Sequence, residues 1–459
     1  MRLARIASAF ALALAGALNS GCAQRQAAMT PPLGPVVPAV QPLGPIRHVV
    51  IVIQENRTFN DFFATYPGGG GTTTANAVAF PRCHIYKAKA ITLAKVDLAT
   101  DRDFNHSYQG YVKARDHGAM DGFDKISHGN GKLECRQPYQ YTDPAQIQPY
   151  WDMAAQYALA ARMFTTQGSS SFTAHQDLIA GGTFVAPNEA LIDSPGCSGS
   201  KCIWGCDAPS NTRTQLITEN NRYLGGKGPF PCLSYGTLRD LLDARHVSWK
   251  YYVPLMCCSA FGKLMSAFDA IKAVRHSKEW TTNVISPQTL IFSDISNGAL
   301  PAVSWVIPDE SDSDHPGNNS DTGPSWVASV VNAVGESPDW KTTVIVVLWD
   351  DWGGLYDNID PVQKGYGGLG FRVPAIIISP YAKKGFVSTT HYEFGSVLKY
   401  IEDNWRLGSL HTTDKRSVSI VNCLNYAQKP RSFRPIQAKY SSEYFLHKPP
   451  SYLPVDNDM

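Results

Sequence analysis

Pairs of polar residues directly follow two long apolar runs of this 459-residue chain. Glu55 and Asn56 come after the run VVIVI, and Asp350 and Asp351 come shortly after the run TVIVVL. Carboxylate and amide oxygens suit a divalent metal ion that prefers oxygen ligands. An acid after a strand is also an ordinary way to begin a turn, and a Gly-Gly dipeptide follows the second pair closely. Either pair alone is therefore a weak signal for a metal site.

A serine-rich segment supplies a candidate nucleophile. Residues 167–177 read QGSSSFTAHQD, in which Ser171 is the last of three consecutive serines and a helical pattern follows. A serine at the start of a helix is most often a cap. The alternative is a nucleophile placed where the N–H groups of the first helical turn face a phosphate. The chain lacks the G-x-S-x-G motif of serine esterases, which counts against a serine carboxyl esterase.

Histidines form the third part of a possible site. His106 lies in DFNHSYQG, His175 lies in the serine segment, and His315 lies in DHPG. A lone histidine is more often a structural or surface residue than a catalytic one. His315 is the strongest candidate because it follows a third apolar run, residues 302–307, together with several acids. These acids are Asp309, Glu310, Asp312 and Asp314.

The apolar runs predict the elements that would position these residues. Short buried strands are expected at 49–53, 302–307, 343–348 and 375–378, with helices between them. Strands that alternate with helices favour an α/β fold with a mainly parallel sheet. The carboxyl ends of parallel strands share one edge of the sheet, which is where ligands bind. We therefore expect the polar residues after these strands to converge. The helices are predicted at 144–160, 237–246, 325–334 and 391–405.

The two ends of the sequence differ in character. Residues 1–22 combine arginines, a short Ala/Leu run and small residues, which predicts a secretory signal. LNSGC resembles a lipobox, so Cys22 is either lipidated or removed with the signal. Residues 23–45 are rich in proline and predict an extended linker. Residues 46–459 are expected to form a single domain with a loop-rich insertion near 185–235. The predicted location is periplasmic, extracellular or lipid-anchored to the envelope.

The net charge and the cysteine spacing argue against nucleic-acid binding and against a zinc site. The formal net charge is +2, which gives no electrostatic case for nucleic acid as a partner. Nine cysteines follow the signal, and export makes disulfides plausible. The spacings within 197–232 do not fit a zinc-type C-x-x-C pair, so we favour disulfides over metal binding there. The four cysteines of this region are Cys197, Cys202, Cys206 and Cys232.

Several ordered motifs together resemble the bacterial phosphoesterase family, which contains phospholipases C and acid phosphatases. They are ENRTFNDFF, the serine segment ending AHQDLIAGGT, LPAVSWVIPDESDSDHPG, WDDWGGLYDNIDP and RVPAIIISPYAKKG. The match runs from about Ile46 to about Leu407. The family often has Y-D-H-V where this chain has Tyr356-Asp357-Asn358-Ile359, so any role of that histidine is missing.

The resemblance implies an alkaline-phosphatase-like three-layer fold and a hydroxyl nucleophile beside one divalent metal ion. Carried over by motif, Ser171 is the nucleophile, and His106 and His315 contact the phosphoryl group or the leaving oxygen. The implied metal ligands are Glu55, Asn56, Asp350 and Asp351. The metal would be Ca, Mg, Mn or Zn. Because three serines are adjacent, the register of Ser171 could shift by one.

Three functions remain open from the sequence. The leading hypothesis is an exported phosphoric ester hydrolase of the phospholipase C type, with a phospholipid as substrate and a phosphoseryl intermediate. The second is an acid phosphatase on small soluble phosphomonoesters. The third is a non-catalytic surface lipoprotein on the same scaffold, which joint retention of Glu55, Asn56, Ser171, Asp350 and Asp351 speaks against.

Overall fold

The apolar runs that precede the candidate site residues form neighbouring parallel strands. β1 (His48–Gln54) pairs with β14 (Val303–Val306) on one side and with β15 (Thr343–Trp349) on the other. Nearly every residue of the three strands is buried. Strands covered on both faces carry continuous β-branched runs rather than alternating ones, and VVIVI and TVIVVL are of this kind.

A computed structural model describes residues 40–99, 102–127, 131–196, 203–256, 265–451 of the chain. The predicted signal at 1–22, Cys22 and the first part of the 23–45 linker lie outside the described residues, as do Cys197 and Cys202. The described residues belong to one compact unit. Within the described ranges, no helix is long and apolar enough to cross a membrane.

The central sheet has eight strands in the order β13-β12-β14-β1-β15-β17-β6-β18. All neighbours pair in parallel except at β17, which is antiparallel to both β15 and β6. The sheet is therefore mainly parallel, as the sequence predicts. The other strands are β6 (Ala158–Ala160), β12 (Trp249–Tyr252), β13 (Val284–Ile285), β17 (Ala375–Ile378) and β18 (Phe386–Ser388).

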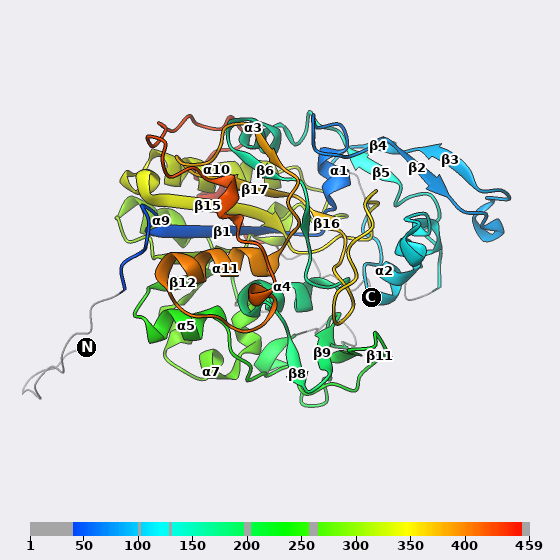
Figure 1. Cartoon of the computed structure of the whole chain (residues 1–459), viewed down its shortest axis with the longest axis horizontal. Helices are drawn as coiled ribbons and strands as arrows, with labels where there is room; N and C mark the ends of the chain where they lie inside the picture. The colour runs from blue at the N-terminus through cyan, green and yellow to red at the C-terminus, as the bar shows by residue number, and fades with distance from the viewer. Residues whose placement is uncertain (1–39, 100–101, 128–130, 197–202, 257–264, 452–459) are drawn as a thin grey trace, which may run out of the picture. The chain divides into compact units, whose positions relative to one another are not determined.

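Helices cover both faces of this sheet and complete the three layers (Figure 1). On one face α3 (Gln148–Gln156) and α10 (Gly323–Glu336) pack against the sheet and against each other. On the other face α4 (Ser171–Ala180) packs against α5 (Leu238–Ala244) and α11 (Phe394–Trp405). The three-layer α/β fold is confirmed. The shorter helices are α1 (Phe59–Phe63), α2 (Tyr108–Arg115), α7 (Lys272–Arg275), α8 (Glu279–Thr282), α9 (Leu290–Ser296) and α12 (Ser442–His447).

One predicted helix is wrong in its bounds. The expected helix at 144–160 begins at Gln148, and its last residues form β6 instead. Residues 143–147 form a turn before the helix, in which Asp143 Oδ1 accepts from the backbone N–H of Ala145 and Asp143 Oδ2 accepts from Lys95 Nζ at 2.6 Å. Gln146 Oε1 accepts from the backbone N–H of Leu98.

The region near 185–235, predicted as a loop-rich insertion, contains four short strands between its loops. It contains a four-stranded antiparallel sheet in the order β11-β10-β9-β8. A disulfide joins Cys206 to Cys232 within it, as favoured from the sequence. A second disulfide joins Cys83 to Cys135, and Cys423 is a buried free thiol. The four strands are β8 (Phe184–Ala186), β9 (Glu189–Ile192), β10 (Gln215–Thr218) and β11 (Tyr223–Leu224).

The remaining strands lie outside both of these sheets. β16 (Arg372–Val373), β7 (Met163–Phe164) and β19 (Tyr392–Glu393) form a three-stranded sheet. β2 (Thr74–Ala77) pairs with β3 (Lys89–Thr92), and β4 (Ala94–Val96) pairs with β5 (Gln140–Thr142).

Candidate active site

The two acid and amide pairs meet at the carboxyl edge of the central sheet. β1 and β15 are in register to their last residues, so Gln54 lies opposite Trp349 and the next residues emerge at the same level. The backbone N–H of Asn56 donates to Asp350 Oδ1 at 3.0 Å. Glu55, Asn56, Asp350 and Asp351 are each fully buried. The convergence expected from strand order is therefore present.

The backbone at this edge is tightly constrained. Asn56 has φ +60°, a left-handed conformation that asparagine tolerates better than most residues. Gly353 follows the second acid pair, and a Cβ atom built on it would lie 2.2 Å from the carbonyl oxygen of Asn56. Only glycine allows this close approach. The Gly-Gly dipeptide thus serves the packing of the two strand exits against each other.

Ser171 reaches these residues from the other side of the site. It is the first residue of α4, with Ser170 as N-cap. Ser171 Oγ lies 3.0 Å from Asp351 Oδ2 and 3.2 Å from Asn56 Oδ1, so its single proton can go to either oxygen. The other serines face elsewhere, since Ser169 Oγ accepts from the backbone N–H of Asp193 and Ser170 Oγ bonds to Ser194 Oγ. Among the three, Ser171 is the serine whose hydroxyl contacts the acid and amide pairs.

His106 and His315 converge on the side chain of Asn56. Their Nδ1 atoms lie 2.8 Å from the carbonyl oxygens of Phe104 and Pro316, which fixes the proton of the neutral rings on Nδ1. Their Nε2 atoms then face Asn56 Nδ2, at 3.4 Å for His106 and 2.9 Å for His315. His106 Nε2 also lies 3.8 Å from Asp351 Oδ2. Two imidazole Nε2 atoms therefore face Asn56, the residue whose Oδ1 also lies 3.2 Å from Ser171 Oγ.

His175 belongs to the site in a way that the sequence reasoning did not assign. It lies one helical turn after Ser171, and its Nε2 is 3.0 Å from Glu55 Oε1 and 3.6 Å from Asp350 Oδ2. Glu55, His175 and Asp350 offer ligand atoms within 4.8 Å of one another, a spacing that can hold a metal ion. Burial lowers the pKa of His175, which keeps the ring neutral and able to bind metal. The i, i+4 spacing from Ser171 was the available signal.

The acidic residues of the site suit the binding of a metal cation. Three buried carboxylates, Glu55, Asp350 and Asp351, gather around one neutral imidazole. The nearby guanidinium of Arg57 faces away and donates to the carbonyl oxygen of Asp314. Burial, followed by the neighbouring Glu55, raises the pKa of Asp350 to about 7. Buried like charges of this kind are stabilised by a metal ion, so the donor set fits the divalent metal that the family implies.

Asp193 supports the segment that carries Ser171, and no sequence motif announced it. Its Oδ1 accepts from the backbone N–H of Tyr108 at 2.7 Å, and its carboxylate also accepts from the backbone N–H of Ser170. Its own carbonyl oxygen accepts from Thr173 Oγ1. Burial raises its pKa to about 7. Asp193 follows β9, so the insertion supplies a buried acid that joins the start of α4 to the start of α2.

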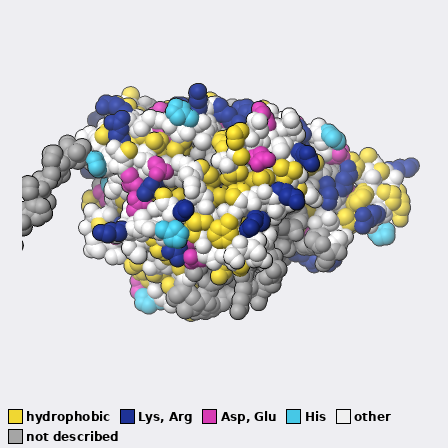
Figure 2. Space-filling model, turned by 90° about the horizontal axis from the view of Figure 1, so that it is seen from below, with side chains coloured by type: hydrophobic (Ala, Val, Ile, Leu, Met, Phe, Trp, Pro, Cys, Tyr) yellow, Lys and Arg dark blue, Asp and Glu magenta, His cyan; other side chains and the backbone are white. Residues whose placement is uncertain are grey.

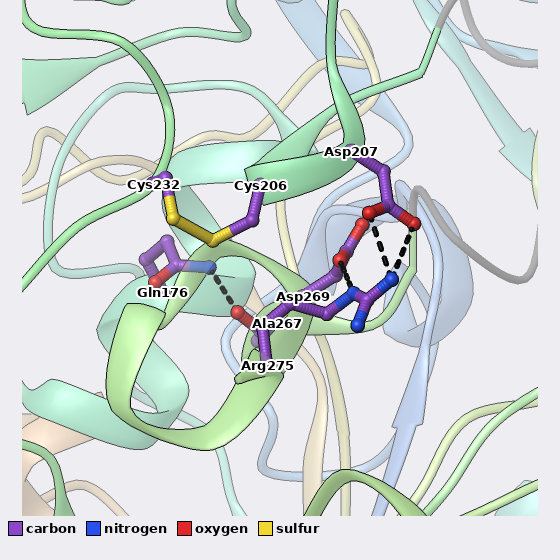
Figure 3. Close-up of a disulfide and its surroundings, with 7 residues drawn as sticks. All are labelled: Gln176, Cys206, Asp207, Cys232, Ala267, Asp269 and Arg275. Atoms are coloured by element: carbon purple, nitrogen blue, oxygen red, sulfur yellow. Dashed lines mark hydrogen bonds and ion pairs between the residues drawn. A yellow bond between two sulfur atoms is a disulfide. The ribbon is translucent and has the colours of Figure 1, made fainter. Parts of the chain in front are cut away.

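The far part of α4 is anchored to the segment 267–275, which is in turn paired with the insertion (Figure 3). Gln176 Nε2 donates to the carbonyl oxygen of Ala267 at 2.8 Å. Arg275 pairs with Asp207 at 2.8 Å and with Asp269 at 3.2 Å, next to the Cys206–Cys232 disulfide. These contacts hold the helix of Ser171 against residues 205–207 and 267–275.

Other polar residues that the sequence placed near the edge serve the structure instead. Asp312 pairs with Lys448, and Asp309 accepts from the backbone N–H of Ser451 at 2.9 Å. Asp314 Oδ2 accepts from Tyr150 OH at 2.6 Å. Asn358 Oδ1 accepts from Arg372, the residue that also pairs with Asp357. Of the side chains after β14, His315 is therefore the one that contacts Asn56.

Comparison with known proteins identifies the family. The family model described as the phosphoesterase family matches residues 46–408, which is most of the chain. The chain therefore belongs to the phosphoesterase family. It is 24% identical to phospholipase C B of Mycobacterium tuberculosis, over 88% of this chain and 83% of that protein. It is 31% identical to the hemolytic phospholipase C of Pseudomonas aeruginosa, over 78% of this chain but only 52% of that protein.

A further relative and one solved structure complete the comparison. The non-hemolytic phospholipase C of Burkholderia pseudomallei is 23% identical, over 91% of this chain and 65% of that protein. A Vibrio parahaemolyticus protein of the alkaline phosphatase superfamily aligns over 80% of this chain and 67% of its own, with 10% identity and a TM-score of 0.37. That similarity carries no further argument.

Proposed function

We propose that this chain is a metal-dependent phosphoric ester hydrolase of the phospholipase C type, with Ser171 as its nucleophile. The observation that carries the proposal is the contact of Ser171 Oγ with Asp351 and Asn56, beside the cluster of Glu55, His175 and Asp350. Membership of the phosphoesterase family and the phospholipases C among its relatives support hydrolysis of a phosphoric ester bond. The substrate would be a phospholipid, split into diacylglycerol and a phosphorylated headgroup.

The residues that would hold the metal are those at the carboxyl edge of β1 and β15. Glu55, Asn56, Asp350 and Asp351 supply oxygen atoms, and His175 adds a nitrogen. A bound divalent cation would lower the pKa of a neighbouring hydroxyl and offset the negative charge of the phosphate. The mixed donor set admits Ca, Mg, Mn or Zn.

The chain's own side chains account for the remaining chemistry. Ser171 Oγ attacks phosphorus, its proton passes to Asp351 Oδ2, and the bond to the diacylglycerol oxygen breaks. His106 or His315 is protonated on Nε2 when the anionic substrate is bound, and it gives this Nε2 proton to the leaving oxygen. Water then attacks phosphorus and gives a proton to the same histidine, while the P–Oγ bond breaks and Ser171 Oγ takes its proton back from Asp351, which releases the phosphorylated headgroup. The carbonyls of Phe104 and Pro316 keep both rings oriented throughout.

We also propose that the enzyme is exported and that residues 46–459 act as one catalytic domain. The two described disulfides support an oxidising compartment. Residues 1–22 would direct export, with Cys22 either lipidated or removed. N-terminal sequencing and intact mass of the protein recovered from cell fractions would distinguish these outcomes.

The test is turnover of two chromogenic esters by the purified chain. p-Nitrophenyl phosphorylcholine is a diester and p-nitrophenyl phosphate is a monoester. Ser171→Ala and a chelated sample should both lose turnover, by at least about 100-fold for the serine variant. Ser170→Ala is the matched control, because Ser170 bonds to Ser194 instead of to the site, and it should retain most activity.

Each outcome has a defined meaning. Turnover of the diester that is lost in Ser171→Ala and on chelation supports the proposal. Turnover of the monoester alone replaces it with an acid phosphatase. If turnover is lost in Ser170→Ala but kept in Ser171→Ala, the nucleophile is Ser170 instead of Ser171. Absence of turnover with every added divalent metal would leave a non-catalytic scaffold.

A further inference from the structure

One segment of the chain carries positive charge without any acid. From residue 62 to residue 96 the sequence contains Arg82, Lys87, Lys89 and Lys95, and neither Asp nor Glu. The whole chain is nearly balanced, with 41 basic and 39 acidic residues. A positive segment of this kind is often no more than a solvated surface. Its structure and location decide whether it can act as a binding element.

The segment forms a well-supported projection. β2 and β3 pair antiparallel and extend away from the central sheet (Figure 1). Between them the chain makes a bridge from Phe80 to Ile85, and Cys83 is bonded to Cys135. One side is buried in a second hydrophobic cluster, separate from the core around the central sheet, to which it contributes Ala75, Ala77, Cys83, Ile85 and Ile91. The strand pairing, the disulfide and the buried side chains therefore hold the exposed side of β2 and β3 in a fixed conformation.

The exposed side of this β2–β3 projection, residues 72–96, is basic and aromatic. Tyr86 is 70% exposed, the highest value among the exposed large hydrophobic residues. Arg82, Lys87 and Lys89 are exposed, and none of them forms an ion pair with a residue that the structure describes. Figure 2 shows Lys and Arg side chains together with hydrophobic ones at this end of the molecule. Tyrosine beside lysine and arginine suits the interface between water and an anionic bilayer.

The projection is connected to the end of the molecule that carries the candidate site. β1 and β15 run toward it, so their carboxyl edge faces the same end (Figure 1). The second hydrophobic cluster that supports the projection also includes Trp352 and Tyr356. Trp352 follows Asp351 directly and donates to the carbonyl oxygen of His106 at 2.9 Å. A surface bound by the projection would lie near the site.

We propose that the β2–β3 projection binds the surface of a bilayer that contains anionic phospholipids. Arg82, Lys87 and Lys89 contact the headgroups, and the ring of Tyr86 inserts at their level. This proposal rests on the proposed function, because membrane binding would bring a site that hydrolyses phospholipids to its substrate. The binding step itself needs no catalysis, so it can be tested separately.

The test is co-sedimentation with vesicles at low salt, using the Ser171→Ala chain so that the lipid stays intact. Vesicles of phosphatidylcholine alone are compared with vesicles that also contain phosphatidylglycerol. The triple variant Arg82→Gln, Lys87→Gln, Lys89→Gln should lower the partition coefficient for the anionic vesicles more than tenfold, and Tyr86→Ser should lower it severalfold.

A second triple variant matches the loss of charge elsewhere on the surface. Lys384→Gln, Lys415→Gln, Lys429→Gln removes three exposed lysines away from the projection and should change the partition coefficient less than twofold. Both triple variants should keep the melting temperature of the parent. In a chain with native Ser171, the projection variant should keep turnover of p-nitrophenyl phosphorylcholine and lose turnover of vesicle lipid.

The possible results separate the two proposals. Equal losses in both triple variants, no binding to anionic vesicles, or binding to heparin but not to vesicles would each overturn the projection as a membrane-binding element. If vesicle binding depends on the projection but the chain with native Ser171 hydrolyses neither chromogenic ester nor vesicle lipid, this inference is supported and the proposed function is contradicted.

Discussion

The two sides of the candidate site are held by different kinds of structure. On the strand side, Glu55, Asn56, Asp350 and Asp351 follow two adjacent parallel strands that are in register to their ends. On the other side, Ser171 depends on α4, on Asp193 and on contacts that lead to the insertion. The strand side is fixed by the sheet itself, whereas the proposed nucleophile is fixed by long-range contacts with segments outside the central sheet. Function thus depends on both, and the contacts between them can be tested.

The largest effect should come from Asp351, which joins the two sides. Its Oδ2 accepts from Ser171 Oγ and its Oδ1 accepts from the backbone N–H of Gly353. Asp351→Asn should lower kcat by at least about 100-fold, because it weakens both the proposed proton acceptor of Ser171 and a proposed metal ligand. Steady-state kinetics and the melting temperature would be measured together. The surface variant Asp360→Asn is the control, and a loss below tenfold in Asp351→Asn would mean that the two sides are not coupled here.

A smaller effect should come from Asp193, which acts on one side only. Asp193→Asn keeps the size of the side chain but replaces one carboxylate oxygen with an NH2 group. That group cannot accept a hydrogen bond, so one of the two backbone N–H groups loses its partner. The start of α4 should shift, and kcat should fall about tenfold with little change in KM. Asp207→Asn is the matched control, because Asp207 also belongs to the insertion but pairs with Arg275. A change in KM alone, or equal losses in both variants, would contradict a positioning role for Asp193.

The smallest effect concerns stability on the strand side. Unfolding sets the pKa of Asp350 near its ordinary value of 3.8, and folding raises it to about 7. The folded chain therefore holds a proton that the unfolded chain releases between these values, so the stability of metal-free protein falls as pH rises through this window.

Asp350→Asn removes this penalty and should raise the melting temperature of chelated protein by about 2 °C at pH 7.5, with a smaller gain at pH 5. Asp193 and Asp314 also have pKa values raised to about 7, and they contribute equally to both chains. Calorimetry of parent and variant at both pH values isolates the part that belongs to Asp350. A variant that melts lower than its parent at pH 7.5 would show that the three carboxylates do not repel one another.

The strand side could be predicted from the sequence because its signal is local. The runs VVIVI and TVIVVL mark buried strands, and the polar pairs follow each run after one intervening residue. The orientation of β17 could not be predicted, because AIII reads the same whether the strand is parallel or antiparallel. The helix expected at 144–160 begins four residues late because residues 144–147 form a turn, in which Gln146 accepts from the distant backbone N–H of Leu98. The role of Asp193 could not be predicted, because its carboxylate binds the backbone N–H groups of Tyr108 and Ser170. Every residue except proline has such a group, so these partners leave no mark in the sequence.

The separation in sequence of the contacting residues has a consequence for how the enzyme acquires activity during folding. The hydrogen bond from Asn56 to Asp350 spans 294 residues, and that from Ser171 to Asp351 spans 180. Closing such long loops is slow, and it follows the formation of local helices and turns. A chain that is still being synthesised has no site before residue 351 has joined the sheet. In a refolding experiment, turnover should therefore appear after most of the helical signal, and it would report the completion of the central sheet.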